Sequence, residues 1–90
     1  MMIEILLNGA EITDIAEVHA LFAGPLSFPA WYGNNLDALF DCLGDVSVPV
    51  KITVRAPERL AEALSPKGEP LLELLRRAAE ENRYIVFAAE

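Results

Sequence analysis

Three short apolar runs of strand length divide the chain. They cover residues 3–7, 48–54 and 84–89, and segments with helical spacing separate them. Strands joined through helices normally lie parallel, because a parallel connection needs a dozen or more residues. The pattern therefore predicts an α/β fold in which helices pack against a small three-stranded parallel sheet. No linker, repeat or low-complexity run interrupts the chain, so residues 1–90 are expected to form a single domain.

The first helical segment has ordinary start and stop signals. The first is predicted to begin with Thr13 as its N-cap and to stop at Gly24-Pro25. Its buried face comprises Ile15, Val18 and Phe22. A shorter helical turn is expected near residues 57–64.

The last helical segment is predicted to carry a balanced polar face. It follows three breaks, at Pro66, Gly68 and Pro70. Its buried stripe comprises Leu71, Leu74, Leu75 and Ala78. On the opposite face, pairs of opposite charge at i,i+4 spacing are Glu73–Arg77, Arg76–Glu80 and Arg77–Glu81. These pairs would neutralise one another on the helix surface.

The second helical segment has a very different charge pattern. Its inward positions are Leu36, Leu39 and Leu43. Asp37 and Asp41 face outward one turn apart, without a basic partner on the helix, and such a like-charged pair costs roughly 0.2–0.5 kcal/mol. Either Asn34 or Asn35 can cap the helix start. A local cost of this kind points to a role outside the helix.

Two aromatic residues, Trp31 and Tyr32, immediately precede this acidic helix. Aromatic side chains beside exposed charges are typical of protein-binding surfaces, where they anchor a partner. We therefore expect a binding surface at the start of the acidic helix.

The net charge of −7 is distributed unevenly. Residues 1–50 contain seven acids and no lysine or arginine, whereas residues 51–90 contain seven acids and all seven bases. An acidic surface repels nucleic acid and speeds the encounter with basic partners. Direct binding to nucleic acid is therefore not expected, although solubility alone would also account for the charge.

Several functional classes find no support in the sequence. No apolar run approaches 18 residues and no basic leader region is present, so neither a membrane span nor a signal peptide is predicted and a cytoplasmic location is expected. The single cysteine, Cys42, cannot form an internal disulfide and is expected to be structural.

Catalytic and metal-binding signals are equally sparse. His19, the only histidine, falls on the apolar side of its helix and is expected to be packed, which excludes a histidine-rich zinc site. Asp37 and Asp41 alone offer too few ligands for tight calcium binding, and magnesium would normally need a phosphate substrate beside them. No phosphate-binding loop or nucleophile elbow appears. We therefore predict a protein without enzymatic activity, metal or cofactor, with a metal-assisted enzyme as a minor alternative.

Residues 31–43, which read Trp-Tyr-Gly-Asn-Asn-Leu-Asp-Ala-Leu-Phe-Asp-Cys-Leu, resemble the signature of the barstar family. This family comprises intracellular inhibitors of barnase-type ribonucleases. The resemblance extends over almost the whole chain, from the opening strand with Asn8-Gly9 to the last helix and strand. It implies a three-stranded parallel sheet and an inhibitory surface built from the second helix and its adjoining loops.

The resemblance also implies a role for each residue of that surface. Asp41 would occupy the phosphate-binding site of the ribonuclease, where a carboxylate mimics RNA. The surface around it would comprise Trp31, Asn35, Asp37 and Phe40, completed by Gly44 and Asp45 in the loop after Leu43. Simpler explanations stay open for three of them: Phe40 as the edge of the core, Trp31 as packing at the helix start, and Asn35 as a cap.

Some positions depart from the family pattern. Trp31 stands where the family reference has tyrosine, and Phe40 where it has tryptophan. The loop of residues 44–49 is one residue shorter and lacks a second tryptophan. Arg77 aligns with a peripheral glutamate of the family, which would weaken or redirect a contact with a basic enzyme. These departures imply that the known ribonuclease need not be the target of this chain.

The function implied is that of a bacterial immunity protein, monomeric when free, that occludes the active site of a basic, secreted, barnase-type ribonuclease. The alternative is a barstar-like acidic module for a different basic partner, such as another toxin nuclease or a nucleic-acid-binding protein.

Overall fold

The computed structural model describes residues 1–90 and contains three strands and four helices. In chain order these are β1 (Ile3–Asn8), α1 (Ile15–Ala23), α2 (Leu36–Gly44), β2 (Val50–Arg55), α3 (Pro57–Ala63), α4 (Gly68–Glu81) and β3 (Ile85–Ala89). The predicted α/β fold is confirmed. No helix combines the length and the apolar character that a membrane crossing would require.

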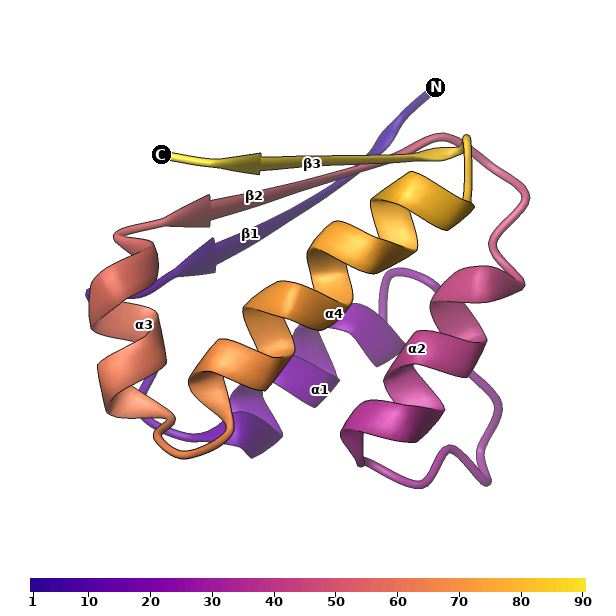
Figure 1. The fold of residues 1–90 in the computed structure, drawn as a ribbon. Coiled ribbons are helices and arrows are strands. Elements are labelled where there is room, and N and C mark those ends of the chain that lie inside the picture. The colour runs from indigo at the N-terminus through magenta and orange to yellow at the C-terminus, as the bar shows by residue number, and fades with distance from the viewer.

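The three strands form one parallel sheet in the order β1-β2-β3. On the central strand, Val50, Ile52 and Val54 are fully buried, while Lys51 and Arg55 between and beyond them are exposed. This alternation follows from the two-residue period of a strand, which sends successive side chains to opposite faces. All four helices accordingly lie on one side of the sheet, and the other side faces solvent (Figure 1).

The hydrophobic core lies between the inner face of the sheet and the helices. Every helix contributes at least one fully buried side chain, among them Phe22 from α1, Leu39 from α2, Leu60 from α3 and Leu75 from α4. Helix α2 packs chiefly against α4 and lies at the outside of the helical layer (Figure 1). Much of the surface of α2 is therefore free for another role.

The start of α1 differs from the prediction by one residue. Asp14, and not Thr13, is the N-cap, because its carboxylate accepts a hydrogen bond from the backbone N–H of Glu17 at 3.1 Å. The Thr13 hydroxyl instead donates to the Glu17 carboxylate at 2.7 Å. The pKa of Glu17 is lowered by this hydrogen bond and by one from the Thr13 backbone.

Two other predicted boundaries were wrong because of proline. Strand β2 begins at Val50, and Val48 lies exposed in the preceding loop, since Pro49 has no N–H to donate to the sheet. Helix α4 begins at Gly68 and includes Pro70 in its first turn, where the backbone N–H groups have no partner within the helix. Gly68 also allows α3 to pack closely on α4. A Cβ at this position would lie 2.4 Å from the Ala61 backbone, so only glycine fits there.

The ion pairs on α4 match the sequence prediction in one case of three. Arg77 pairs with Glu81 at 3.6 Å, as predicted. Arg76 pairs with Glu73 at 3.1 Å, one turn back, so neither the predicted Glu73–Arg77 pair nor the Arg76–Glu80 pair forms. All of these side chains are more than half exposed, and such pairs contribute little stability.

A buried polar pair links α1 to the chain that leads into α2. His19 is 3% exposed, which confirms that it is packed, and its Nδ1 lies 2.5 Å from the Tyr32 hydroxyl. Burial, with a smaller effect of Lys67, lowers the pKa of His19, and burial raises the pKa of Tyr32 to about 12. Tyr32 therefore belongs to the core, and its predicted place on the binding surface was wrong.

His19 should make the stability of the protein depend on pH. Because its pKa is lower in the folded protein than the ordinary value of about 6.5, the unfolded chain takes up the proton more readily. The stabilisation is therefore fully present above about pH 6.5 and is lost as the pH falls below that value. One proton limits the slope to about 1.4 kcal/mol per pH unit, which urea unfolding between about pH 5 and 7.5 can measure.

The control is His19→Gln, which has no group that titrates in this range. This variant should show a flatter dependence on pH, whatever its absolute stability. A parent protein whose stability is unchanged or rises on acidification through this range would contradict the assignment.

Candidate functional site

The start of α2 is fixed by two asparagines with different tasks. Asn35 is the N-cap, and its side-chain oxygen accepts a hydrogen bond from the Ala38 N–H at 2.7 Å. Asn34 has a positive φ of 51°, a conformation that asparagine adopts more readily than most residues. A Cβ at Gly33 would lie 2.9 Å from the Asn35 amide nitrogen, so glycine leaves room for the cap. Of the two predicted caps, the structure selects Asn35.

Both carboxylates of α2 are exposed on the outward face, as the spacing predicts. No lysine, arginine or histidine lies within ion-pairing distance of Asp37 or Asp41, since the only three ion pairs of the structure involve other acids. Phe40 lies between them in sequence and is half-buried against the core. The surface thus presents two free carboxylates beside an aromatic ring.

An open hollow of about 650 Å³ lies between α2 and α4 beside these carboxylates. It is lined by Leu36, Asp37, Phe40, Asp41, Pro70, Glu73, Leu74 and Arg77. The Arg77 guanidinium carbon lies 4.8 Å from the centre of the Phe40 ring, close enough for a cation–π contact. Helix spacing alone could not place this cation beside the acids, because it comes from another helix.

A second hollow, of about 500 Å³, lies on the other side of α2. Trp31 and Asp45 contribute to it, and Trp31 is 83% exposed, so its alternative reading as a packing residue was wrong. Gly44 is exposed at the end of α2, and a Cβ there would meet no atom within 4 Å. The predicted site residues are therefore brought together around one helix: Asp37, Phe40 and Asp41 toward α4, Trp31 and Asp45 toward the loops, and Asn35 and Gly44 at the two ends.

Cys42 is partly buried beside the second hollow. Burial, followed by the nearby carboxylates of Asp45 and Asp41, raises the pKa of its thiol. The thiolate is the reactive form of cysteine, so this environment suppresses reactivity and agrees with the predicted structural role.

The end of α2 is held by a residue that the sequence analysis missed. Asn82, which follows α4 and is 9% exposed, donates through its amide to the carbonyls of Leu43 and Val46, each at 2.9 Å. Its side-chain oxygen accepts from the Tyr84 N–H at 2.9 Å. The last carbonyls of a helix have no hydrogen-bond donor within the helix, and the Asn82 amide supplies a donor to the Leu43 carbonyl. Its sequence position resembles an ordinary helix end, so no pattern reveals this contact across 39 residues.

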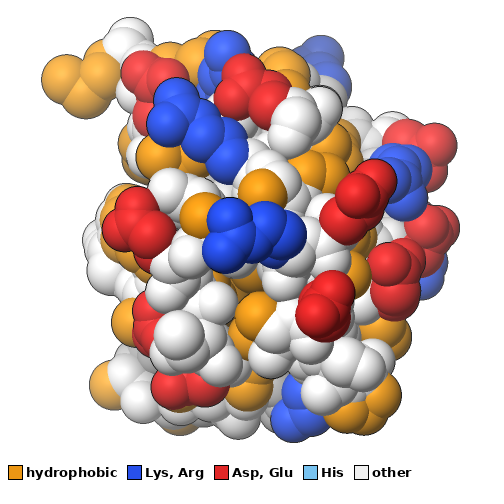
Figure 2. Space-filling view, turned by 90° about the vertical axis from the view of Figure 1, so that its left-hand side faces the viewer, with side chains coloured by type: hydrophobic (Ala, Val, Ile, Leu, Met, Phe, Trp, Pro, Cys, Tyr) orange, Lys and Arg blue, Asp and Glu red, His pale blue; other side chains and the backbone are white.

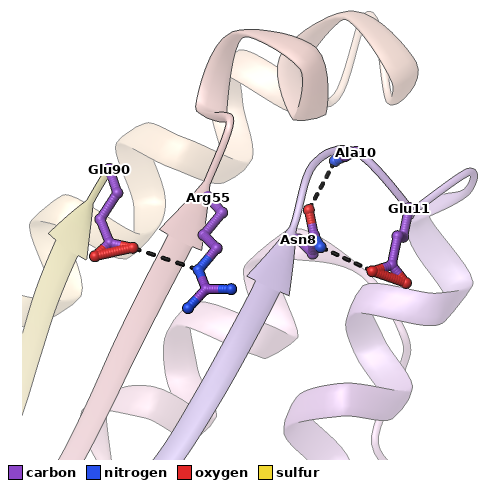
Figure 3. Close-up of polar contacts among 5 residues, drawn as sticks. All are labelled: Asn8, Ala10, Glu11, Arg55 and Glu90. Atoms are coloured by element: carbon purple, nitrogen blue, oxygen red, sulfur yellow. Dashed lines mark hydrogen bonds and ion pairs between the residues drawn. The ribbon is translucent and has the colours of Figure 1, made fainter.

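Other parts of the surface are weaker candidates for a binding site. Ligands of open α/β sheets usually bind beyond the carboxyl ends of the strands. There, Arg55 pairs with Glu90 at 3.4 Å, and Asn8 bonds to Glu11 and Ala10, so the polar groups satisfy one another (Figure 3). Basic and acidic side chains are interspersed over this end of the molecule (Figure 2). His, Cys, Asp and Glu side chains nowhere gather in groups of three or more that could hold a metal ion.

The family described as Barstar (barnase inhibitor) matches residues 2–90, so this chain belongs to the barstar family. The chain is also similar to a protein of Bacillus subtilis (strain 168) named "Putative ribonuclease inhibitor YrdF". The two are 35% identical over 81 residues, which cover 89% of each chain.

Replacing Asn82 should destabilise the end of α2. Asn82→Ala removes the amide group that donates to the Leu43 and Val46 carbonyls. The loss of these hydrogen bonds should lower the free energy of unfolding by about 1–3 kcal/mol, as measured in a urea titration. The control Asn82→Asp keeps an acceptor for the Tyr84 N–H but removes the amide donor. An Asn82→Asp variant as stable as the parent would show that the amide is not the tether.

Proposed function

We propose that this protein inhibits a ribonuclease by covering its active site with α2, and that it is not itself an enzyme. Membership of the barstar family supports this proposal, as does the relative whose name describes a ribonuclease inhibitor. The observation that carries it is the pair of exposed carboxylates, Asp37 and Asp41, which are held on a capped helix without any ion-pair partner.

The chemistry of this pair suits an enzyme that binds phosphate. Arginine, lysine and protonated histidine side chains arranged for a phosphate also form charge-assisted hydrogen bonds with a carboxylate. Asp41, one turn into the exposed face of α2, would take the place of a phosphate of RNA, with Asp37 beside it. The excess of acid in residues 1–50 would also speed the encounter with a basic enzyme.

Apolar contacts would flank this charged centre. Trp31 is almost fully exposed and Phe40 half-exposed, and large aromatic side chains are the commonest anchors of protein interfaces. Asn35, Gly44 and Asp45 would complete the contact at the two ends of α2. The surface would thus combine a carboxylate centre with two aromatic anchors.

The biological setting that fits this activity is immunity. A cell that makes a secreted, barnase-type ribonuclease needs an inhibitor inside it before export. We propose that this chain acts there, in the cytoplasm, as a monomeric single domain until it meets its enzyme.

Asp41→Ala is the direct test of the proposal. Truncating one partner of a buried interfacial charge pair costs about 2–5 kcal/mol, a range drawn in part from the barnase–barstar complex and therefore a precedent from this family. The inhibition constant in a fluorogenic RNA-cleavage assay with a barnase-type ribonuclease should rise by at least about thirtyfold. Thermal stability should hardly change, because Asp41 is exposed and unpaired.

A matched control for Asp41 is Glu62→Ala. Glu62 is also an exposed acid without an ion pair, but it lies on α3, at the opposite end of the molecule from α2 (Figure 1). This control separates local contact from net charge. Equal losses in both variants would argue against occlusion by α2. A folded parent that inhibits no barnase-type ribonuclease would instead favour a different basic partner.

Gly44→Ala separates binding from stability. The added Cβ meets no atom within 4 Å in the free protein, and alanine favours a helix over glycine by up to about 1 kcal/mol. The melting temperature should therefore stay the same or rise. Inhibition should weaken, because the added methyl group would stand where the enzyme approaches the backbone. Undiminished inhibition would remove Gly44 from the contact surface.

A further inference from the structure

Arg77 is the only cation in the hollow beside the two carboxylates of α2. That hollow also contains Glu73, so its charged residues are three acids and one arginine. The Arg77 guanidinium lies over the Phe40 ring at 4.8 Å and pairs with Glu81 at 3.6 Å. Its side chain is 54% exposed. A partner that covers Phe40 must therefore also meet Arg77.

The contacts within the free protein leave Arg77 with unused hydrogen-bonding capacity. A guanidinium has five N–H donors and cannot lose its proton, and Arg77 makes one ion pair that is itself open to solvent. Stacking on an aromatic ring restricts the side chain but does not occupy its N–H groups. Arg77 can thus donate to a group that approaches from the partner.

The sign of the charge determines which group this can be. An enzyme surface that placed only cations against this hollow would oppose Arg77, and covering a charge without a partner is unfavourable. A carboxylate matches the planar guanidinium and accepts two parallel hydrogen bonds from it. A partner that placed a cation against Arg77 would be repelled, so Arg77 would also exclude wrong partners.

We propose that Arg77 is a specificity-determining residue, and that the ribonuclease bound by this protein presents a carboxylate opposite it, at the rim of its basic active site. This assignment rests on the proposed function, since it takes α2 and the adjoining hollow as the contact surface. It adds the kind of enzyme that is selected: one with a basic centre and an acid on the side that faces α4.

The next residue of the same helix provides a matched control. Arg76 is equally exposed, pairs with Glu73 at 3.1 Å and lies 5.9 Å from the centre of the Phe87 ring. It does not line the hollow. Arg76→Gln and Arg77→Gln therefore make the same change in charge on one helix, but only the second alters the proposed contact.

The experiment is a double-mutant cycle against a barnase-type ribonuclease. Each charged residue at the rim of the enzyme's active site is reversed singly, and inhibition constants are measured for the parent, Arg77→Gln and Arg76→Gln. At one rim position, the acidic form of the enzyme should favour the parent over Arg77→Gln by about tenfold relative to the basic form. Arg76→Gln should respond as the parent does.

Three results would overturn the assignment. The parent and Arg77→Gln could respond alike to every reversal, which would mean that Arg77 does not face the enzyme. Arg76→Gln could show the same coupling as Arg77→Gln, which would mean that only the net charge of α4 matters. A parent that inhibits no ribonuclease would overturn the proposed function as well. By contrast, inhibition that depends on Asp41 without coupling at Arg77 would overturn only the role of Arg77.

Discussion

The candidate binding surface depends on how firmly α2 is held in place by the rest of the protein, because a helix of nine residues with two like charges is not stable alone. It is held in three ways. Asn35 caps its start, Leu39 and Leu43 are fully buried on its inner side, and the Asn82 amide donates to the Leu43 carbonyl near its end. The cap is local, but the leucines pack into the shared core and Asn82 lies 39 residues from Leu43, so the folded core, together with the cap, sets the position of the carboxylates. A partner would then meet a surface that is already ordered, which lowers the cost of association.

The position of α2 in the fold explains why it can carry unpaired charge. Helix α4 packs against β3 as well as against α2, so α2 buries its leucines without lying deep in the molecule. Its carboxylates stay in water, where the repulsion between Asp37 and Asp41 costs only roughly 0.2–0.5 kcal/mol. An interfacial charge pair is worth about ten times as much on the precedent of this family. The small cost in the free protein is thus compatible with a large gain in a complex.

The sequence predicted features that depend on neighbouring residues better than features that depend on contacts between distant parts of the chain. Strand and helix content followed from periodicity, and the exposed carboxylates followed from helical spacing within one short segment. Errors arose where two local solutions were equally good, as for Thr13 and Asp14 at the start of α1, or where Pro70 fits a first turn as well as a break. The family resemblance singled out Arg77, but no local pattern could place it over Phe40 or predict the hydrogen bond from Asn82 to Leu43, because each of these contacts reaches α2 from a different element.

Affinity and selectivity would have different origins in the proposed complex. A carboxylate that stands in for a phosphate fits any enzyme with a phosphate-binding centre, so Asp41 would supply affinity with little discrimination. Discrimination must then come from groups that a wrong partner cannot satisfy. Trp31 and Phe40 impose a shape, but an apolar contact alone discriminates weakly between similar partners. The Arg77 guanidinium, fixed beside the carboxylates of α2, would require an acid on the partner, whereas the carboxylates require cations. An unrelated basic protein is less able to satisfy both requirements than either one alone.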